Sequence, residues 1–203
     1  MTELHPRNAR LLERIRAAED ATGRLAVPDM AGWDIFPFEG GIRLKQIDDP
    51  VLPEPLRHGE DGEPCGACTD GLDRAIWADD RWMLVPLTES SIPIVLLEPQ
   101  DHLDSTDLDE DMAARLGVLT LRLEHAILAL GGVARVQVMK IGDGSAHLHV
   151  WFLARPEGLL QMRGSSLTDW ADALPVLPED EWREIQREIA ANLAASAGGR
   201  ALV

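Results

Sequence analysis

Apolar positions early in the chain predict one helix followed by a long irregular region. Residues 4–22 carry Leu11, Leu12 and Ile15 on one stripe at helical spacing, and Gly23 is a plausible end for that helix. Residues 33–47 lack a clear period, apart from a predicted strand over 42–47. Residues 48–73 are rich in Pro, Gly and Asp, which predicts a loop.

The middle of the chain alternates in the manner of strands and then takes up a helical period. Strands are expected over 75–79 and 81–87, joined by a turn at Asp79-Asp80, and over 92–99. A long helix is expected over 109–130, with an acidic first turn and Gly131-Gly132 at its end. Its apolar positions repeat at three- and four-residue spacing: Met112, Leu116, Leu119, Leu123 and Ile127.

The last third predicts a hairpin and two helices. Strands over 134–142 and 146–154 are separated by the turn "DGS", and helices are expected over 168–174 and 179–196. Strands, one long helix, strands and then helices favour an α+β fold with an antiparallel sheet and the long helix across one face. Helical additions would lie at both ends of the chain.

Composition and charge limit the partners. A chain of 203 residues can bury one sizeable core, and its formal net charge of -16 comes from 35 acidic and 19 basic residues. Such a charge predicts that the protein binds neither nucleic acid nor a membrane surface, although local donors can still hold a small phosphorylated ligand. The charged N-terminus has no apolar signal-peptide core, so a cytoplasmic location is expected.

Both cysteines lie in "PCGAC", as Cys65 and Cys68. In a reducing compartment a structural disulfide is not expected, so C-x-x-C indicates metal binding, with redox chemistry or coincidence as the alternatives. The predicted loop around these cysteines favours metal, because a redox pair would open a helix after a strand. A structural zinc site needs four N or S ligands, and His102 and His147 are candidates for the other two.

The stretch "AHLHVWFLARP" places two histidines on one face of a predicted strand. His147, His149 and Trp151 share that face, while Leu148, Val150, Phe152 and Ala154 face the core. Two imidazoles so placed can bind one metal together, or one can bind the metal while the other is free for chemistry. Both can also be ordinary structural histidines.

The ordered motifs from about Cys65 to Pro156 resemble the histidine triad (HIT) superfamily. The matching pieces are the C-x-x-C, the hairpin "IWADDRWMLVPL", "PQDHL", the helix start "STDLDED", and "HLHVWFLARP". The resemblance extends to the zinc-bearing branch that includes galactose-1-phosphate uridylyltransferases. It implies a HIT-like domain over 61–160, with an N-terminal extension over 1–60 and a C-terminal helical extension over 161–203 packed on the same domain.

The resemblance also implies roles for individual residues. Structural zinc would be held by Cys65, Cys68, His102 and His147, and His149 would attack an α-phosphate to form a covalent nucleotidyl-histidine. Water or a second phosphate would then release the nucleotide, so the chain would be a hydrolase or a transferase. Many HIT proteins are dimers, which makes a homodimer an expectation here too. Expected substrate-binding residues are Lys140, Gly144, Ser145, Trp151 and Arg155.

Trp151 departs from the family, which has histidine or glutamine at this third position. An indole N–H can donate to a phosphate oxygen, but it cannot move a proton near neutral pH. The side chain could also stack on a base or fill space. The leading expectation is therefore a nucleotidyl hydrolase or transferase, and the alternative is a non-catalytic, zinc-containing nucleotide-binding protein. A third possibility is a catalytic zinc bound by both His147 and His149.

Overall fold

The computed structural model describes residues 5–21, 23–27, 29 and 54–203. The strand expected over 42–47 lies outside these residues. The helical segments are α1 (Pro6–Ala18), α2 (Gly66–Asp70), η2 (Gly71–Arg74), α3 (Glu110–Leu128), η3 (Gly164–Ser166), α4 (Leu167–Ala173) and α5 (Glu179–Ala197). The strands are β1 (Trp77–Ala78), β2 (Trp82–Pro86), β3 (Ile94–Pro99), β4 (Val133–Lys140), β5 (Val150–Pro156) and β6 (Arg200–Ala201).

The strands form one six-stranded sheet in the order β4-β5-β3-β2-β1-β6. All neighbouring pairs are antiparallel. The predicted α+β class with an antiparallel sheet and a long helix across it is confirmed. Among the described residues no helix combines the length and apolar character that crossing a lipid bilayer requires.

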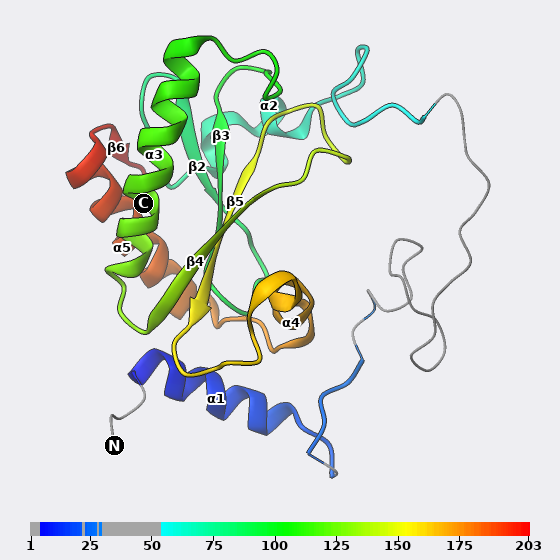
Figure 1. The fold of residues 1–203 in the computed structure, drawn as a ribbon, viewed down its shortest axis with the longest axis vertical. Helices are drawn as coiled ribbons and strands as arrows, with labels where there is room; N and C mark the ends of the chain where they lie inside the picture. The colour runs from blue at the N-terminus through cyan, green and yellow to red at the C-terminus, as the bar shows by residue number, and fades with distance from the viewer. Residues whose placement is uncertain (1–4, 22, 28, 30–53) are drawn as a thin grey trace.

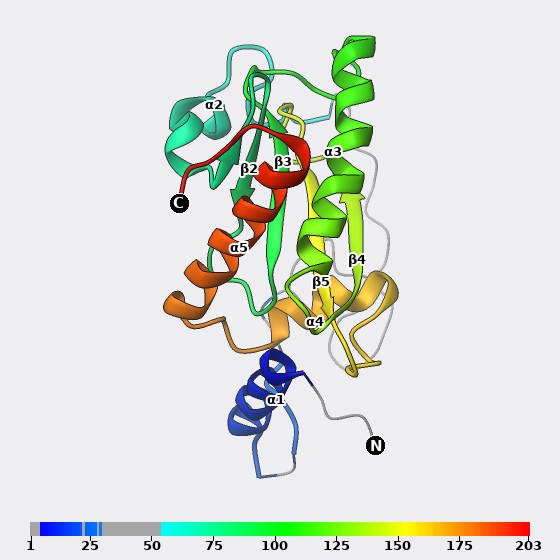
Figure 2. The ribbon, with the colours of Figure 1, turned by 90° about the vertical axis from the view of Figure 1, so that its left-hand side faces the viewer.

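Helices α3 and α5 lie together over one face of the sheet (Figures 1 and 2). Leu119 and Leu123 of α3 and Ile189 of α5 are fully buried there against Phe152 and Leu97 of the sheet. A smaller apolar cluster on the opposite face joins Ile94 and Leu153 to α4, and Leu11 of α1 packs into it. Helix α4 lies near the end of β5, and the start of β5 is at the other end of the sheet, toward α2 (Figure 1).

Two local expectations are wrong, and both concern the site. The strand expected over 146–154 begins only at Val150, because the preceding backbone bonds elsewhere: Leu148 N–H donates to Leu103 O, and Ala146 N–H donates to His58 O. The inward alternation still holds, since Leu148 and Val150 are buried in the main core.

The loop expected over 48–73 contains a short helix where the cysteines are. Cys65 is the residue before α2, and Cys68 lies within it. The backbone N–H of Thr69 donates to Cys65 O, closing the helical turn that follows Cys65. The strand β6 was not predicted, because two residues carry no recognisable period.

Candidate functional site

Cys65, Cys68, His102 and His147 come together at one end of the sheet. Each offers one ligand atom, and these four atoms lie within 4.8 Å of one another. Cys65 Sγ and Cys68 Sγ each lie 3.5 Å from His147 Nδ1, and Cys68 Sγ lies 3.4 Å from His102 Nδ1. A tetrahedral zinc with ordinary bond lengths would separate S and N ligands by about 3.6 Å. The donor set and spacing therefore fit a zinc ion with four protein ligands.

Backbone carbonyls fix the orientation of both histidine ligands. His147 Nε2–H donates to Pro99 O at 2.9 Å, and His102 Nε2–H donates to Gly59 O at 3.0 Å. These bonds hold each proton on Nε2 and leave Nδ1 free to bind a cation. In zinc sites, backbone carbonyls commonly orient histidine ligands by accepting the other ring N–H in this way. Gly59 has φ +84°, and a Cβ there would lie 2.7 Å from the ring of His102.

The electrostatics of the cluster suit a cation as well. Burial and the neighbouring Cys65 sulfur raise the pKa of Cys68 to about 11 although the charge of Arg74 opposes the rise, so without a bound metal ion this sulfur keeps its proton. Burial also lowers the pKa of His147, which favours the neutral ring that a metal needs. The cysteines are free thiols and not a disulfide.

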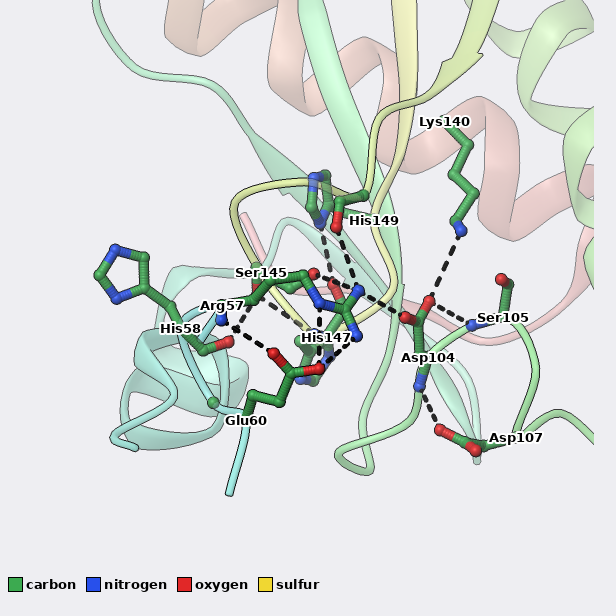
Figure 3. Close-up of polar contacts among 12 residues, drawn as sticks. Arg57, His58, Glu60, Asp104, Ser105, Asp107, Lys140, Ser145, His147 and His149 are labelled. Atoms are coloured by element: carbon green, nitrogen blue, oxygen red, sulfur yellow. Dashed lines mark hydrogen bonds and ion pairs between the residues drawn. The ribbon is translucent and has the colours of Figure 1, made fainter. Parts of the chain in front are cut away.

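His149 stands next to this cluster but is not one of the four residues in it. Its Nδ1–H donates to the His147 carbonyl at 2.9 Å (Figure 3). The lone pair on Nε2 is therefore available, and the ring is half-buried. This is the arrangement that an attacking imidazole needs. The geometry therefore does not favour the third possibility, a zinc bound by both His147 and His149.

Trp151 lies beside His149, with ring centroids 6.1 Å apart and planes at 70°. Its side chain packs against the smaller apolar cluster under α4. The indole N–H is buried and lacks a hydrogen-bond partner within the described part of the chain. Of the roles expected for Trp151, filling space in the apolar cluster is the one that its packing supports.

The expected substrate-binding residues fall in two places. Lys140 ends β4 opposite Val150, and its Nζ lies 3.6 Å from Asp104 Oδ1. Gly144 and Ser145 lie in the turn that leads to His147, and Ser145 Oγ accepts a hydrogen bond from His147 N–H at 3.1 Å. Arg155 lies six residues beyond His149 on an extended segment, about 20 Å away, so it is not brought to the others.

Arg57 was missed by the sequence analysis and organises the turn between β4 and His147 (Figure 3). Its guanidinium donates to Asp104 Oδ2 at 2.8 Å, to Gly142 O at 3.1 Å and to Glu60 Oε1 at 3.1 Å. Burial would raise the pKa of Asp104, but Arg57, the Ser105 N–H and Lys140 outweigh it and lower that pKa. No motif points to Arg57, because Asp104 and Gly142, the partners through which it reaches the turn, are distant in sequence.

The sequence analysis also missed an ion pair on the face of the sheet that carries Trp151. Glu98 near the end of β3 is 3 % exposed and forms an ion pair with Arg74 of η2. Burial raises the pKa of Glu98, and the charge of Arg74 opposes that rise. The signal in the sequence was a single acidic residue inside the apolar stretch "IPIVLLEP".

Comparison with known proteins identifies the fold. Neither a protein-family model nor a curated protein sequence matches the chain. A solved histidine triad protein from Marinobacter aquaeolei matches 61 % of this chain and 90 % of its own, with 18 % identity and a TM-score of 0.51. One from Bradyrhizobium japonicum matches 60 % and 88 %, with 22 % identity and a TM-score of 0.48.

A Zn-bound histidine triad family protein from Mycobacterium smegmatis matches 60 % of this chain and 84 % of its own, with 19 % identity and a TM-score of 0.43. The chain thus has an α+β histidine-triad-like fold, as its motifs predicted. Its relation to the uridylyltransferase branch stays a prediction.

Proposed function

We propose that the protein is a nucleotidyl hydrolase or transferase with a structural zinc, acting through a covalent nucleotidyl-His149. The observation that carries the proposal is the Nδ1–H of His149 held on the His147 carbonyl, which leaves Nε2 as a nucleophile. Cys65, Cys68, His102 and His147 would hold the zinc. The ion would supply rigidity, because four protein ligands leave no open position for substrate.

The chain's own residues account for most of the reaction. His149 Nε2 forms a bond to the α-phosphorus, and the bond from phosphorus to the leaving group breaks, with its electron pair going to that group. Lys140 and the backbone amides of the turn at Gly144 and Ser145 would bind phosphate oxygens. Water or a second phosphate then forms a bond to phosphorus, and the bond from phosphorus to Nε2 breaks with its electron pair returning to Nε2; when water attacks, its proton passes to solvent.

The third position of the motif offers no group that could protonate the leaving group. Trp151 cannot give a proton, and its indole N–H is buried. The substrate is therefore expected to carry a leaving group that departs without an acid, such as a phosphate or pyrophosphate of low pKa. Nucleoside phosphoramidates, whose amine leaves best when protonated, would react more slowly.

A covalent-intermediate experiment tests the proposal. The purified protein is mixed with nucleoside phosphoramidates, dinucleoside polyphosphates and nucleotide sugars, and turnover and the intact mass are recorded. We expect a nucleotidyl adduct in the wild-type protein and none in His149→Ala. His58→Ala is the matched control, because His58 contacts the turn through its backbone. Equal behaviour of all three proteins would remove the enzymatic claim.

The alternative is a non-catalytic nucleotide-binding protein with the same zinc site. Trp151, with no acid or amide at the third position, is the observation that favours it. In that case a nucleoside monophosphate binds, with the same affinity in the wild type and in a variant that cannot be nucleotidylated, and no substrate turns over.

A homodimer and a cytoplasmic location belong to the same proposal. Within the described residues β4 pairs only with β5, so its outer edge is available to a second copy. Val138 on β4 and Leu121 on α3 are exposed apolar side chains. Free thiols suit a reducing compartment. Sedimentation at micromolar concentration would report the dimer, and a monomer at every concentration would exclude it.

A further inference from the structure

Glu98 is a buried carboxylate in a sheet that is otherwise apolar at this depth. Its side chain is 4 % exposed, while that of its partner Arg74 is 25 % exposed. Transferring a carboxylate out of water is costly, and a buried ion pair seldom stabilises a fold more than apolar residues of the same size would. Stability alone is therefore a poor reason for an acid at this position.

The register of the sheet places Glu98 next to His149. Leu96 pairs with Trp151, and Leu97 pairs with Val150, so the next positions along the two segments are Glu98 and His149. Facing residues of antiparallel segments project to the same side, which is the side of Trp151 and not the main core. The two groups are close enough that charge on the His149 ring lowers the pKa of Glu98.

The chemistry proposed for His149 creates a positive charge at this spot. When a neutral imidazole that keeps its Nδ1–H gives the Nε2 lone pair to phosphorus, the ring becomes cationic. The His147 carbonyl accepts the Nδ1–H bond but carries no full charge. A fixed carboxylate beside the ring would stabilise the developing charge without reorganising. Burial raises the pKa of that carboxylate, the charge of Arg74 opposes the rise, and the ion pair fixes the direction of the carboxylate.

We propose that Glu98, held by Arg74, is a positioning residue that stabilises His149 electrostatically as the ring becomes a cationic N-phosphoryl species. The inference rests on the function proposed above. It assigns a role to two residues outside the histidine motif, and it explains an acid inside a buried strand. Glu98 itself touches neither substrate nor phosphorus in this scheme.

The test replaces the charge and keeps the shape. In single-turnover experiments we expect Glu98→Gln to form the nucleotidyl adduct about ten- to a hundredfold more slowly, as for loss of one preorganised electrostatic group. The substrate concentration that gives half of the maximal adduct-forming rate should not rise, and the zinc content should stay the same. Glu98→Asp should recover part of the rate. Glu188→Gln, which removes an acid that binds Arg7 on the far side of the molecule, is the control.

A second readout does not depend on a nucleotide substrate. Inorganic phosphoramidate can phosphorylate an accessible imidazole nitrogen, and the product ring carries the same new charge. We expect phosphohistidine at residue 149 to form more slowly in Glu98→Gln than in the wild type. If no nucleotide substrate reacts but this difference is present, the proposed function fails and the role of Glu98 stands. If both rates are unchanged in Glu98→Gln, the inference is overturned.

Discussion

The ion pair of Glu98 and Arg74 places a charged side chain inside an otherwise apolar strand. Glu98 is almost completely buried, while Arg74 reaches solvent and has a buried Nε without a partner among the described residues. An acid so placed depends on its partner, because a lone buried carboxylate loses its hydration with no compensation. The pair should therefore behave asymmetrically when either member is removed.

Arg74→Met should lower the free energy of unfolding by roughly 3 kcal/mol, because it leaves the Glu98 charge buried and unpaired. The double variant Arg74→Met with Glu98→Leu should recover most of that loss, since an apolar pair needs no solvation. Urea unfolding of the zinc-loaded proteins measures both. A double variant as unstable as Arg74→Met would mean that the pair is needed for the fold itself.

Gly59 offers a second test at the scale of one residue. Gly59→Ala should weaken zinc binding by about tenfold or more, because its Cβ would lie 2.7 Å from the ring of His102, whose Nε2–H bonds to Gly59 O. Competition with a chromophoric chelator measures the affinity. Gly62→Ala is a matched control: Gly62 has φ +89°, but its Cβ would meet nothing within 4 Å. Equal affinities in the two variants would show that backbone strain, and not the contact with His102, sets the effect.

Among the elements, those with long apolar periods could be predicted and those set by distant contacts could not. The helix expected over 109–130 is present as α3, Glu110–Leu128, because its apolar stripe spans five turns. The start of β5 was misplaced, since distant carbonyls such as Leu103 O bind the backbone before Val150. The C-x-x-C spacing pointed to Cys65 and Cys68, and the resemblance to the histidine triad family implied His102 and His147 as the other two zinc ligands. Arg57 and Arg74 could not be recognised, because Asp104 and Glu98, with which they pair, lie on other segments.

The N-terminus of α3 makes a prediction that depends on pH. Asp109 caps the helix by accepting from Met112 N–H at 2.7 Å, and that bond, with Arg81 beside it, lowers the pKa of Asp109. Asp109→Ala should lower the unfolding midpoint at pH 7 by about 2–4 °C, as expected for a lost cap in a chain of this size.

A depressed pKa means that this stabilisation is complete above the ordinary pKa of an Asp and is lost as the pH falls through the lower folded value. The gap between wild type and Asp109→Ala should therefore close below about pH 4. Thermal scans in chelator keep zinc loss from contributing to the comparison. Asp109→Asn retains an accepting oxygen, so it should lie between the two proteins at pH 7. A gap that persists at pH 2 would contradict the argument.

At the scale of the whole molecule, α1 contacts α5, the turn before β4 and the end of β5, which are distant from it in sequence. It lies at the end of the sheet away from the zinc ligands (Figure 1). Its Arg14 pairs with Glu181 of α5 at 3.0 Å, and Arg7 pairs with Glu188 of the same helix. Leu11 is buried under α4. In a chain with net charge -16, a basic helix docked on acidic α5 also reduces the repulsion within the folded state.

Asn8 is the contact through which this docking can be tested. Its side chain is buried, and Nδ2 donates to Gly132 O at 2.7 Å and to Glu157 O at 2.8 Å, joining α1 to the turn before β4 and to the end of β5. Asn8→Ala should lower the free energy of unfolding by about 2 kcal/mol, because two hydrogen bonds from a buried side chain to backbone carbonyls are lost. Denaturant unfolding measures the loss, and hydrogen exchange should show faster opening of α1.

Asn192→Ala provides the matched comparison. Asn192 on α5 makes a single bond of 3.3 Å to Ala126 O from a partly exposed position, so its removal should cost well under half as much. Zinc content and the rate of His149 adduct formation should be unchanged in Asn8→Ala, because α1 lies at the opposite end of the sheet (Figure 1). A loss of zinc in Asn8→Ala would show that the two ends of the molecule unfold together, and that α1 supports the site as well as the core.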